Sequence, residues 1–195
     1  MENIVNEPAL QYNYLSAEEY LEAERKATEK HELINGKIVT MQGGSLKHNA
    51  IVRNLIIGIG SFLKGKPCDV FPSDLRVNVP SVNSFMYPDL TIVCGKPELL
   101  DENFDSILNP SVIIEVLSHS TESYDRGTKF FNYQQIASLK EYILINSTSV
   151  LISTITKKDD GLWKFENITE PTALLTISTI GQQLPLSDIY DGVTF

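Results

Sequence analysis

The sequence lacks the features that mark membrane-spanning and secreted proteins. Its 195 residues contain no apolar run long enough to cross a bilayer, and the nearest, residues 55–63, is interrupted by Gly58, Gly60 and Ser61. Residues 1–8 show no basic region followed by an apolar one, so we expect no signal peptide. These absences predict a cytoplasmic protein that makes no contact with a membrane.

Cysteine is nearly absent. The chain has two cysteines, Cys68 and Cys94, which are isolated from each other and have no Cys-x-x-Cys spacing. This pattern excludes a dense disulfide framework. We expect both residues to be reduced thiols in the core of a cytoplasmic protein.

Basic residues are also few. The chain has 16 lysines and arginines against 25 aspartates and glutamates, which gives a net charge of −9. A broad, non-specific nucleic-acid surface is disfavoured, because such binding depends on lysines and arginines that displace counterions. An enzyme that contacts phosphate locally and uses metal ions to neutralise it is not excluded.

Length and composition predict one globular domain. Hydrophobic residues at 42% and charged residues at 21% are ordinary for a folded protein, and 195 residues can bury a sizeable core. Residues 1–13 are polar and show no periodicity, which predicts a flexible N-terminal tail. Residues 14–195 contain no internal repeat and no linker, so we expect them to form a single domain.

Local patterns predict a helix, a hairpin, a second helix, and then strands on either side of a third helix. A capping box at Ser16-Ala17-Glu18-Glu19 starts a helix expected to reach about Lys30, and Asn35-Gly36 predicts a type I′ hairpin turn. The other expected helices are 47–64 and 124–137, with a short one in the acidic connection 95–109. The expected strands are 68–71, 75–79, 90–94, 111–117, 141–145, 150–156 and 162–168, and one after 174. This order predicts an α/β (α+β) domain in which helices flank a mixed central sheet, with an N-terminal helix-hairpin and extra C-terminal strands.

Glu115 is the one charge inside the apolar run 112–117. Such a run predicts a buried strand, where a lone charge is costly unless it is paired or bound to a metal. Asp89 opens another apolar strand, and Lys129 follows Asp125 by one helical turn, a pair that alone would only support the helix. Two carboxylates on strands, followed by a lysine, could bind a hard cation and an attacking water. The simpler alternative is that Glu115 forms a salt bridge with a neighbour.

Three further residues are candidates, each with a structural alternative. Arg76 shares a strand face with Asp74 and Asn78, and it could contact phosphate through its fork or form an exposed salt bridge. Glu32 follows the first helix, where a lone glutamate is usually solvated. His48 lies near the start of the second helix, where a histidine is usually structural but can help hold an anion.

Apart from Arg76, the candidate residues fall into five short segments. In chain order they are Tyr14-Leu15-Ser16 with the following helix, Glu32-Leu33-Ile34-Asn35-Gly36, residues 45–49, Tyr87-Pro88-Asp89-Leu90, and Ile114-Glu115-Val116-Leu117-Ser118 with Asp125, Lys129 and Tyr133 behind. Together they resemble the Uma family of restriction-endonuclease-like proteins, within the PD-(D/E)xK nuclease superfamily. The resemblance covers about residues 14–190, and it rests on the ordered set because no single motif is specific.

The resemblance implies a restriction-endonuclease-like fold and roles for the central residues. Asp89 and Glu115 take the places of the acidic motif residues, which are catalytic and bind Mg²⁺ (or Mn²⁺) in the superfamily. Leu117 stands where the superfamily pattern has lysine. The catalytic lysine would therefore be Lys129, on the next helix.

Four more residues would complete the site by resemblance. Glu32 matches a catalytic glutamate that many superfamily members supply from the first helix. His48 matches a recurrent family histidine. Asp125 and Tyr133 recur at helical spacing with Lys129 and would support it.

The implied activity is Mg²⁺-dependent endonucleolytic hydrolysis of phosphodiester bonds in nucleic acid, DNA in preference to RNA, by a homodimer. The alternative is a non-catalytic binding or interaction protein that retains the nuclease fold. The acidic composition and the leucine at position 117 favour this alternative. A hydrolase acting on another phosphate-containing substrate is not distinguished from the first by sequence.

Overall fold

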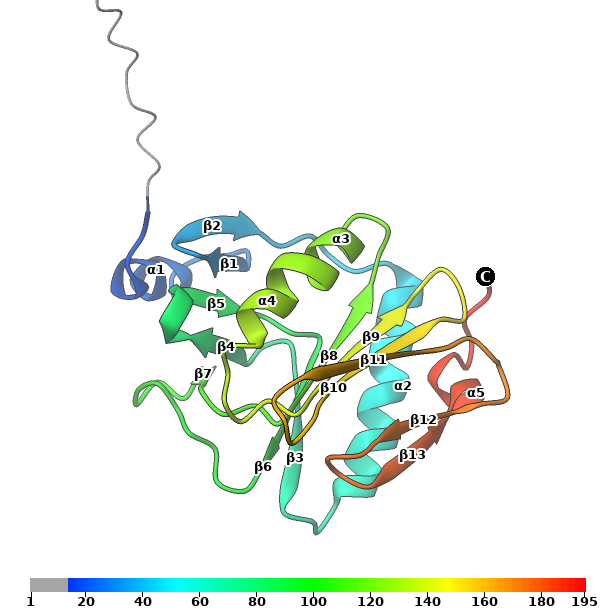
Figure 1. Cartoon of the computed structure of the whole chain (residues 1–195). Helices are drawn as coiled ribbons and strands as arrows, with labels where there is room; N and C mark the ends of the chain where they lie inside the picture. The colour runs from blue at the N-terminus through cyan, green and yellow to red at the C-terminus, as the bar shows by residue number, and fades with distance from the viewer. Residues whose placement is uncertain (1–13) are drawn as a thin grey trace, which may run out of the picture.

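The computed structural model describes residues 14–195, which form two β-sheets, a C-terminal hairpin and the helices packed around them (Figure 1). The predicted flexible tail, residues 1–13, lies outside the described residues. The helical segments are α1 (Ala17–Glu24), α2 (Leu46–Leu63), the 3-10 turn η1 (Pro80–Val82), α3 (Glu122–Tyr124), the π-helical turn η2 (Asp125–Lys129), α4 (Phe130–Tyr133) and α5 (Leu186–Ile189).

The strands form a six-stranded central sheet, a five-stranded second sheet and a separate hairpin. Their bounds are β1 (His31–Ile34), β2 (Lys37–Thr40), β3 (Cys68–Pro72), β4 (Arg76–Val79), β5 (Ser84–Met86), β6 (Leu90–Cys94), β7 (Ser106–Ile107), β8 (Val112–Leu117), β9 (Glu141–Asn146), β10 (Ile152–Lys157), β11 (Trp163–Ile168), β12 (Leu174–Ile177) and β13 (Gln182–Pro185). The central sheet has the order β11-β10-β9-β8-β6-β3, the second sheet β2-β1-β5-β4-β7, and the hairpin β12-β13. The central sheet is mixed, as predicted, because β8 and β9 run parallel while its other pairs are antiparallel.

Both faces of the central sheet are buried, because successive side chains along a strand enter two different cores. From β8, Ile114 packs into the core that contains α2 and the C-terminal hairpin, whereas Ile113 and Leu117 pack into the core that contains α4 and the second sheet. Figure 1 shows α2 on one side of the sheet and the α3–η2–α4 segment on the other. Glu115 shares the face of Ile113 and Leu117, so it points toward the helical segment.

The N-terminal helix and hairpin form as predicted, but the helix is shorter. Ser16 and Glu19 make both hydrogen bonds of the capping box. The helix ends at Glu24 instead of near residue 30, because the Glu24 carboxylate accepts from the backbone amide of His31 at 2.9 Å and turns the chain into β1. The hairpin turn at residues 35–36 has positive φ angles of 50° and 78°, which confirms type I′.

The second predicted helix is confirmed almost residue for residue. Ser45 caps α2 by accepting from the amide of His48 at 3.2 Å, and buried apolar residues recur every four positions from 51 to 63. In the part of the chain that the structure describes, no helix combines the length and the apolar character needed to cross a membrane.

Two predicted elements differ. The third helix covers residues 122–133 instead of 124–137, and its middle turn is π-helical. The acidic connection 95–109 contains the short strand β7 instead of a helix. β7 forms because its residues pair in parallel with the start of β4, which extends the second sheet.

The prediction of two reduced cysteines is wrong. Cys68 and Cys94 stand directly opposite each other on the antiparallel strands β3 and β6, and they form a disulfide. The missing Cys-x-x-Cys spacing carried no information about this pair, because a register between strands brings together residues that are far apart in sequence.

Reduction of this disulfide should lower the free energy of unfolding by roughly 3 kcal/mol, because the bond links residues 26 apart and restricts the unfolded chain. Urea denaturation with and without dithiothreitol measures the change. A Cys68→Ala/Cys94→Ala variant is the control, and it should unfold like the reduced protein whether or not reductant is present. Equal urea midpoints for the oxidised and reduced wild type would contradict this account.

Candidate active site

Asp89 and Glu115 lie side by side where β6 begins. Leu90 pairs with Ile114 in the antiparallel β6–β8 ladder, so the residue before Leu90 lies opposite Glu115. The backbone amide of Asp89 donates to Glu115 Oε2 at 3.2 Å, and the amide of Val116 donates to Asp89 Oδ2 at 2.7 Å. The register of the sheet therefore brings together the two carboxylates that the sequence analysis selected on separate strands.

Lys129 reaches back from the helical segment to these carboxylates. Its Nζ lies 3.1 Å from Glu115 Oε1 and 3.0 Å from Glu32 Oε1. Asp125 Oδ1 lies 3.5 Å from the same ammonium, and the Tyr133 hydroxyl lies 3.4 Å from Glu115 Oε1. Lys129 is only 5% exposed, so its ammonium is held almost entirely by these acidic neighbours.

The turn that carries Asp125 and Lys129 is π-helical. Such wide turns often occur at functional sites. The hydroxyl of Tyr142, from β9, donates to the backbone carbonyl oxygen of Asp125 at 2.9 Å. This hydrogen bond ties the π-helical turn to the central sheet and keeps it close to the Glu115 strand.

Glu32 comes from the second sheet and is buried rather than solvated. Its Oε1 accepts from the backbone amide of Tyr87 at 2.9 Å, and its Oε2 accepts from the Tyr124 hydroxyl at 2.9 Å. With the contact to Lys129 already described, both oxygens are engaged. Glu32 therefore links the second sheet to the helical segment directly behind the Asp89–Glu115 pair.

His48 lies in the first turn of α2 and contacts Asp89. Its Nε2 is 3.1 Å from Asp89 Oδ2, while its Nδ1 is buried and has no hydrogen-bond partner among the described residues. Burial lowers the pKa of His48, but the contact with Asp89 outweighs burial and raises it above the usual value. Gly44 packs against the ring, and a Cβ built there would lie 2.5 Å from His48 Nδ1.

Negative charge exceeds positive charge around these residues. Glu115, Glu32 and Asp125 surround the single ammonium of Lys129, and Asp89 adds a further negative charge beside Glu115. Burial raises the pKa of Asp125. Burial would lower the pKa of Lys129, but its acidic neighbours, led by Glu115, raise it well above the usual value, which keeps the ammonium protonated.

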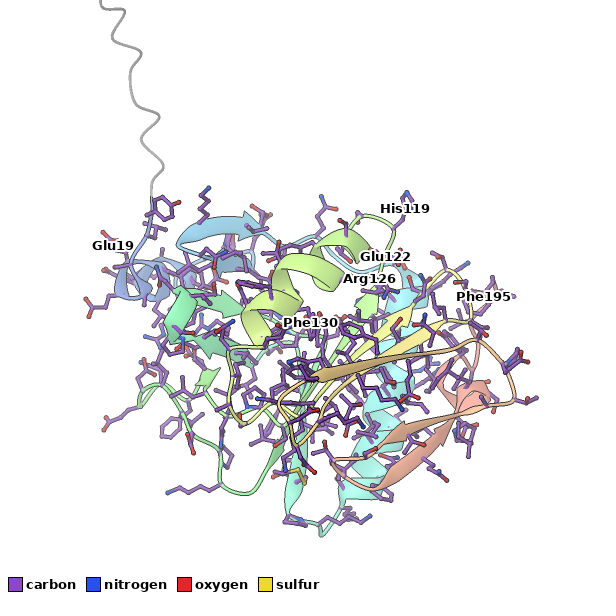
Figure 2. All side chains as sticks on the ribbon, viewed as in Figure 1. Glu19, His119, Glu122, Arg126, Phe130 and Phe195 are labelled. Atoms are coloured by element: carbon purple, nitrogen blue, oxygen red, sulfur yellow. A yellow bond between two sulfur atoms is a disulfide. The ribbon has the colours of Figure 1, made fainter. Side chains whose placement is uncertain are left out.

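The acidic groups open onto a cleft of about 690 Å³. Glu32 and Tyr133 do not line the cleft but lie behind the side chains that do. Residues of two loops, 41–45 and 118–121, form much of the rest of its lining. Figure 2 shows His119 on the second loop, between the end of β8 and the helical segment. A substrate can therefore reach Asp89 and Glu115 between these two loops.

Arg76, the candidate phosphate contact, is not part of this cleft. It is 3% exposed, forms an ion pair with Asp105, and donates to Ser106 Oγ at 3.2 Å and to the Tyr87 hydroxyl at 3.3 Å. The sequence predicts that Arg76 and Asn78 share one face of β4, but both faces of this strand are buried. Arg76 therefore lies in a buried polar cluster with Asp105, Ser106 and Tyr87 and not on an open surface.

Three residues that hold the site were not selected from the sequence: Tyr87, Tyr124 and Gly44. Tyr87 directly precedes the Pro-Asp pair, and Tyr124 directly precedes Asp125. A tyrosine beside a candidate acid was an available signal, since buried tyrosine hydroxyls need hydrogen-bond partners. Gly44 carried no such signal, because its proximity to His48 depends on how the loop folds.

Gly44→Ala should displace the His48 ring and separate it from Asp89, because the new methyl group would overlap the ring. The pKa of His48 should then fall, since the contact with Asp89 is what raises it. NMR titration of the histidine ring protons measures this change. Gly43→Ala is the matched control, because a Cβ there meets nothing within 4 Å. An unchanged His48 titration in Gly44→Ala would contradict this packing.

The sequence of the chain is similar to a protein family and to two curated proteins. Residues 17–187 match the model of the Uma2 family, whose description is "Putative restriction endonuclease". The uncharacterized protein slr1290 of Synechocystis sp. is 36% identical over 192 residues, which cover 98% of this chain and 100% of that protein. The uncharacterized protein sll1609 of the same organism is 35% identical over 149 residues, which cover 76% of this chain and 84% of that protein.

The fold also matches a solved structure. A crystal structure described as "a putative nuclease belonging to DUF820", from Anabaena variabilis, has a TM-score of 0.77 to this chain at 19% identity, with 92% of this chain and 99% of that chain covered. This likeness confirms the restriction-endonuclease-like arrangement of a mixed sheet flanked by helices. Because the family model matches most of the chain, the protein belongs to the Uma2 family, as its sequence predicts.

Proposed function

We propose that this protein is a metal-dependent endonuclease that hydrolyses phosphodiester bonds in nucleic acid, with Mg²⁺ or Mn²⁺ held by Asp89 and Glu115. The observation that carries the proposal is the pair of adjacent carboxylates facing a cleft, with the Lys129 ammonium directly behind them. The family description and the fold support the same activity.

The donor atoms suit a hydrated hard cation. Mg²⁺ prefers oxygen ligands, keeps several waters, and is often bound by one or two carboxylates. Asp89 accepts hydrogen bonds from described residues through Oδ2 only, and Glu115 Oε2 accepts one backbone amide. Within residues 14–195 no cluster of three His, Cys, Asp or Glu side chains is arranged to hold a metal, so the fit is to two carboxylates completed by water. A divalent cation would also offset the local excess of negative charge.

When bound, the cation would polarise the phosphate and lower the pKa of a coordinated water. The chain's own residues supply position and charge. Lys129, held protonated by Glu32 and Glu115, can donate a hydrogen bond that orients the attacking water or the phosphate oxygen. Its raised pKa favours this orienting role over that of a general base, which would need a neutral amine. His48 positions Asp89 through its Nε2 contact.

The net reaction consumes one water. The water oxygen forms a new bond to phosphorus, the bond to the leaving sugar oxygen breaks, and the water's proton is passed on as the sugar hydroxyl forms. The carboxylates around Lys129 keep its charge next to the phosphate, where negative charge develops in the transition state. A binding protein that retains this fold would bind the metal ion without catalysing this reaction.

Lys129→Met should lower kcat for cleavage of a mixed nucleic-acid substrate by roughly 10²–10³-fold while metal binding is retained, because a lysine orients groups and stabilises charge but does not ligate the ion. Asp89→Asn should lose both hydrolysis and metal binding, because it removes a charged ligand. Cleavage assays and calorimetric titration with Mn²⁺ measure the two properties separately.

Lys129→Arg is the control for folding, because Lys129→Met leaves buried carboxylates unpaired and could cost about 3–5 kcal/mol of stability. The arginine variant keeps the positive charge, and it should fold with near-normal stability yet cleave poorly, since a planar fork does not replace a single ammonium. Undiminished cleavage by Lys129→Met would overturn the role of Lys129. Tight Mn²⁺ binding by a wild-type protein that cleaves no nucleic acid would support the binding-protein alternative.

A further inference from the structure

The cleft contains almost no cationic group available for phosphate. All 16 lysines and arginines lie within residues 14–195, and of these only Lys30 and Lys129 line the cleft. Lys129 is enclosed by carboxylates and is already assigned to the reacting phosphate, so it adds no contact along the rest of the cleft. Lys30 Nζ lies 2.5 Å from Asp74 Oδ1 and donates to the backbone carbonyl of Ser73 at 3.0 Å. Because the Lys30–Asp74 pair is exposed and therefore weak, Lys30 is the one further lysine or arginine of the lining that could transfer to a phosphate. His48 also lines the cleft and can carry positive charge, but its Nε2 is held by Asp89.

The arginines, which are the usual side chains for phosphate recognition, are all placed elsewhere. Arg25 and Arg76 both pair with Asp105, and Arg126 pairs with Glu122. Arg53, on the exposed side of α2, donates to Asn54 Oδ1. None of them lines the cleft.

Neutral hydrogen-bonding groups line the cleft instead. They come from the two loops and the first turn of α2, and they include Gln42, Ser45, Asn49, Ser118, Ser120 and Thr121. Such groups can contact phosphate and sugar oxygens without displacing counterions from a long nucleic acid. Glu29, beside Lys30 in the lining, adds negative charge that opposes the approach of an extended polyanion.

The volume of the cleft, like its lining, suits a small ligand better than a long nucleic acid. A volume of about 690 Å³ falls within the range of small-ligand pockets, roughly 300–1,000 Å³. Specific protein–DNA interfaces bury roughly 1,000–2,500 Å² of strongly basic protein surface. The cleft, which contains no arginine and lies in a chain with a net charge of −9, does not present such a surface.

We infer that the substrate is a short phosphodiester, a single-stranded fragment of a few nucleotides, held by the metal ion at Asp89–Glu115 and by neutral hydrogen bonds. A long duplex gripped by basic side chains does not fit this cleft. This inference rests on the proposed function, because it concerns the substrate of the same site.

The test compares two substrates of the wild-type full chain at saturating Mn²⁺: a labelled single-stranded tetranucleotide and a duplex of about thirty base pairs, with kcat/KM measured at about 50 and 200 mM KCl. The tetranucleotide should be preferred by about tenfold or more, and its kcat/KM should fall by less than about threefold between the two salt concentrations, as expected for at most one cationic contact. Binding through six or more contacts would reduce the value by roughly 10³-fold or more.

Ser120→Arg adds a cation to the exposed loop that lines the cleft, and it should make the logarithmic salt dependence steeper by about 0.7–0.9. Ser187→Arg, on α5 and outside the cleft lining, is the matched control with the same change in net charge, and its salt dependence should equal that of the wild type.

The outcomes separate the two proposals. A preference for the duplex with a steep salt dependence would overturn the short-substrate inference and leave the nuclease function standing. An unchanged salt dependence in Ser120→Arg would also overturn the inference, since the substrate would then not lie along this loop. Cleavage of neither substrate would overturn the proposed function, and the inference with it.

Discussion

The placement of the Lys129 ammonium between Glu32 and Glu115 is the contact on which the site depends. The three groups come from three parts of the fold: Glu32 from the second sheet, Glu115 from the central sheet and Lys129 from the helical segment between them. Each carboxylate is almost fully buried and would be costly without a cationic partner. One side chain therefore neutralises two buried charges and fixes how the sheets and the helical segment meet.

The single positive charge of Lys129 does not balance all of the negative charge in the site. Asp89 and Asp125 remain beside the Lys129 cluster, and only His48 adds a further group that can carry positive charge. A metal ion at Asp89–Glu115 would complete the balance and would expose a polarised water to the cleft. The fold is a scaffold shared by many activities, so hydrolysis is inferred from these side chains and their distances.

Much of the central site could be predicted from local sequence patterns, because two regular periods determine it. The period of two puts Glu115 on the face of β8 that meets the helical segment, and helical spacing puts Asp125, Lys129 and Tyr133 on one side. Contacts that depend on how separate elements dock could not be predicted. The burial of Glu32 requires the second sheet to be in place.

Other differences have the same origin. The Cys68–Cys94 bond depends on the register of β3 against β6, which spans a long connection. The capture of Arg76 by Asp105 depends on the path of residues 95–109, where no periodic pattern exists. These contacts between distant segments decide which candidate side chains reach the cleft.

The most direct test of the central claim is anomalous diffraction from crystals of the protein soaked in Mn²⁺. The account predicts a strong peak between the carboxylate oxygens of Asp89 and Glu115, at ligand distances of about 2.1–2.2 Å with waters completing the coordination. Crystals of Asp89→Asn, treated in the same way, should lack the peak. An absence of Mn²⁺ from this position in saturated wild-type crystals, or a peak of equal strength in Asp89→Asn, would contradict the account.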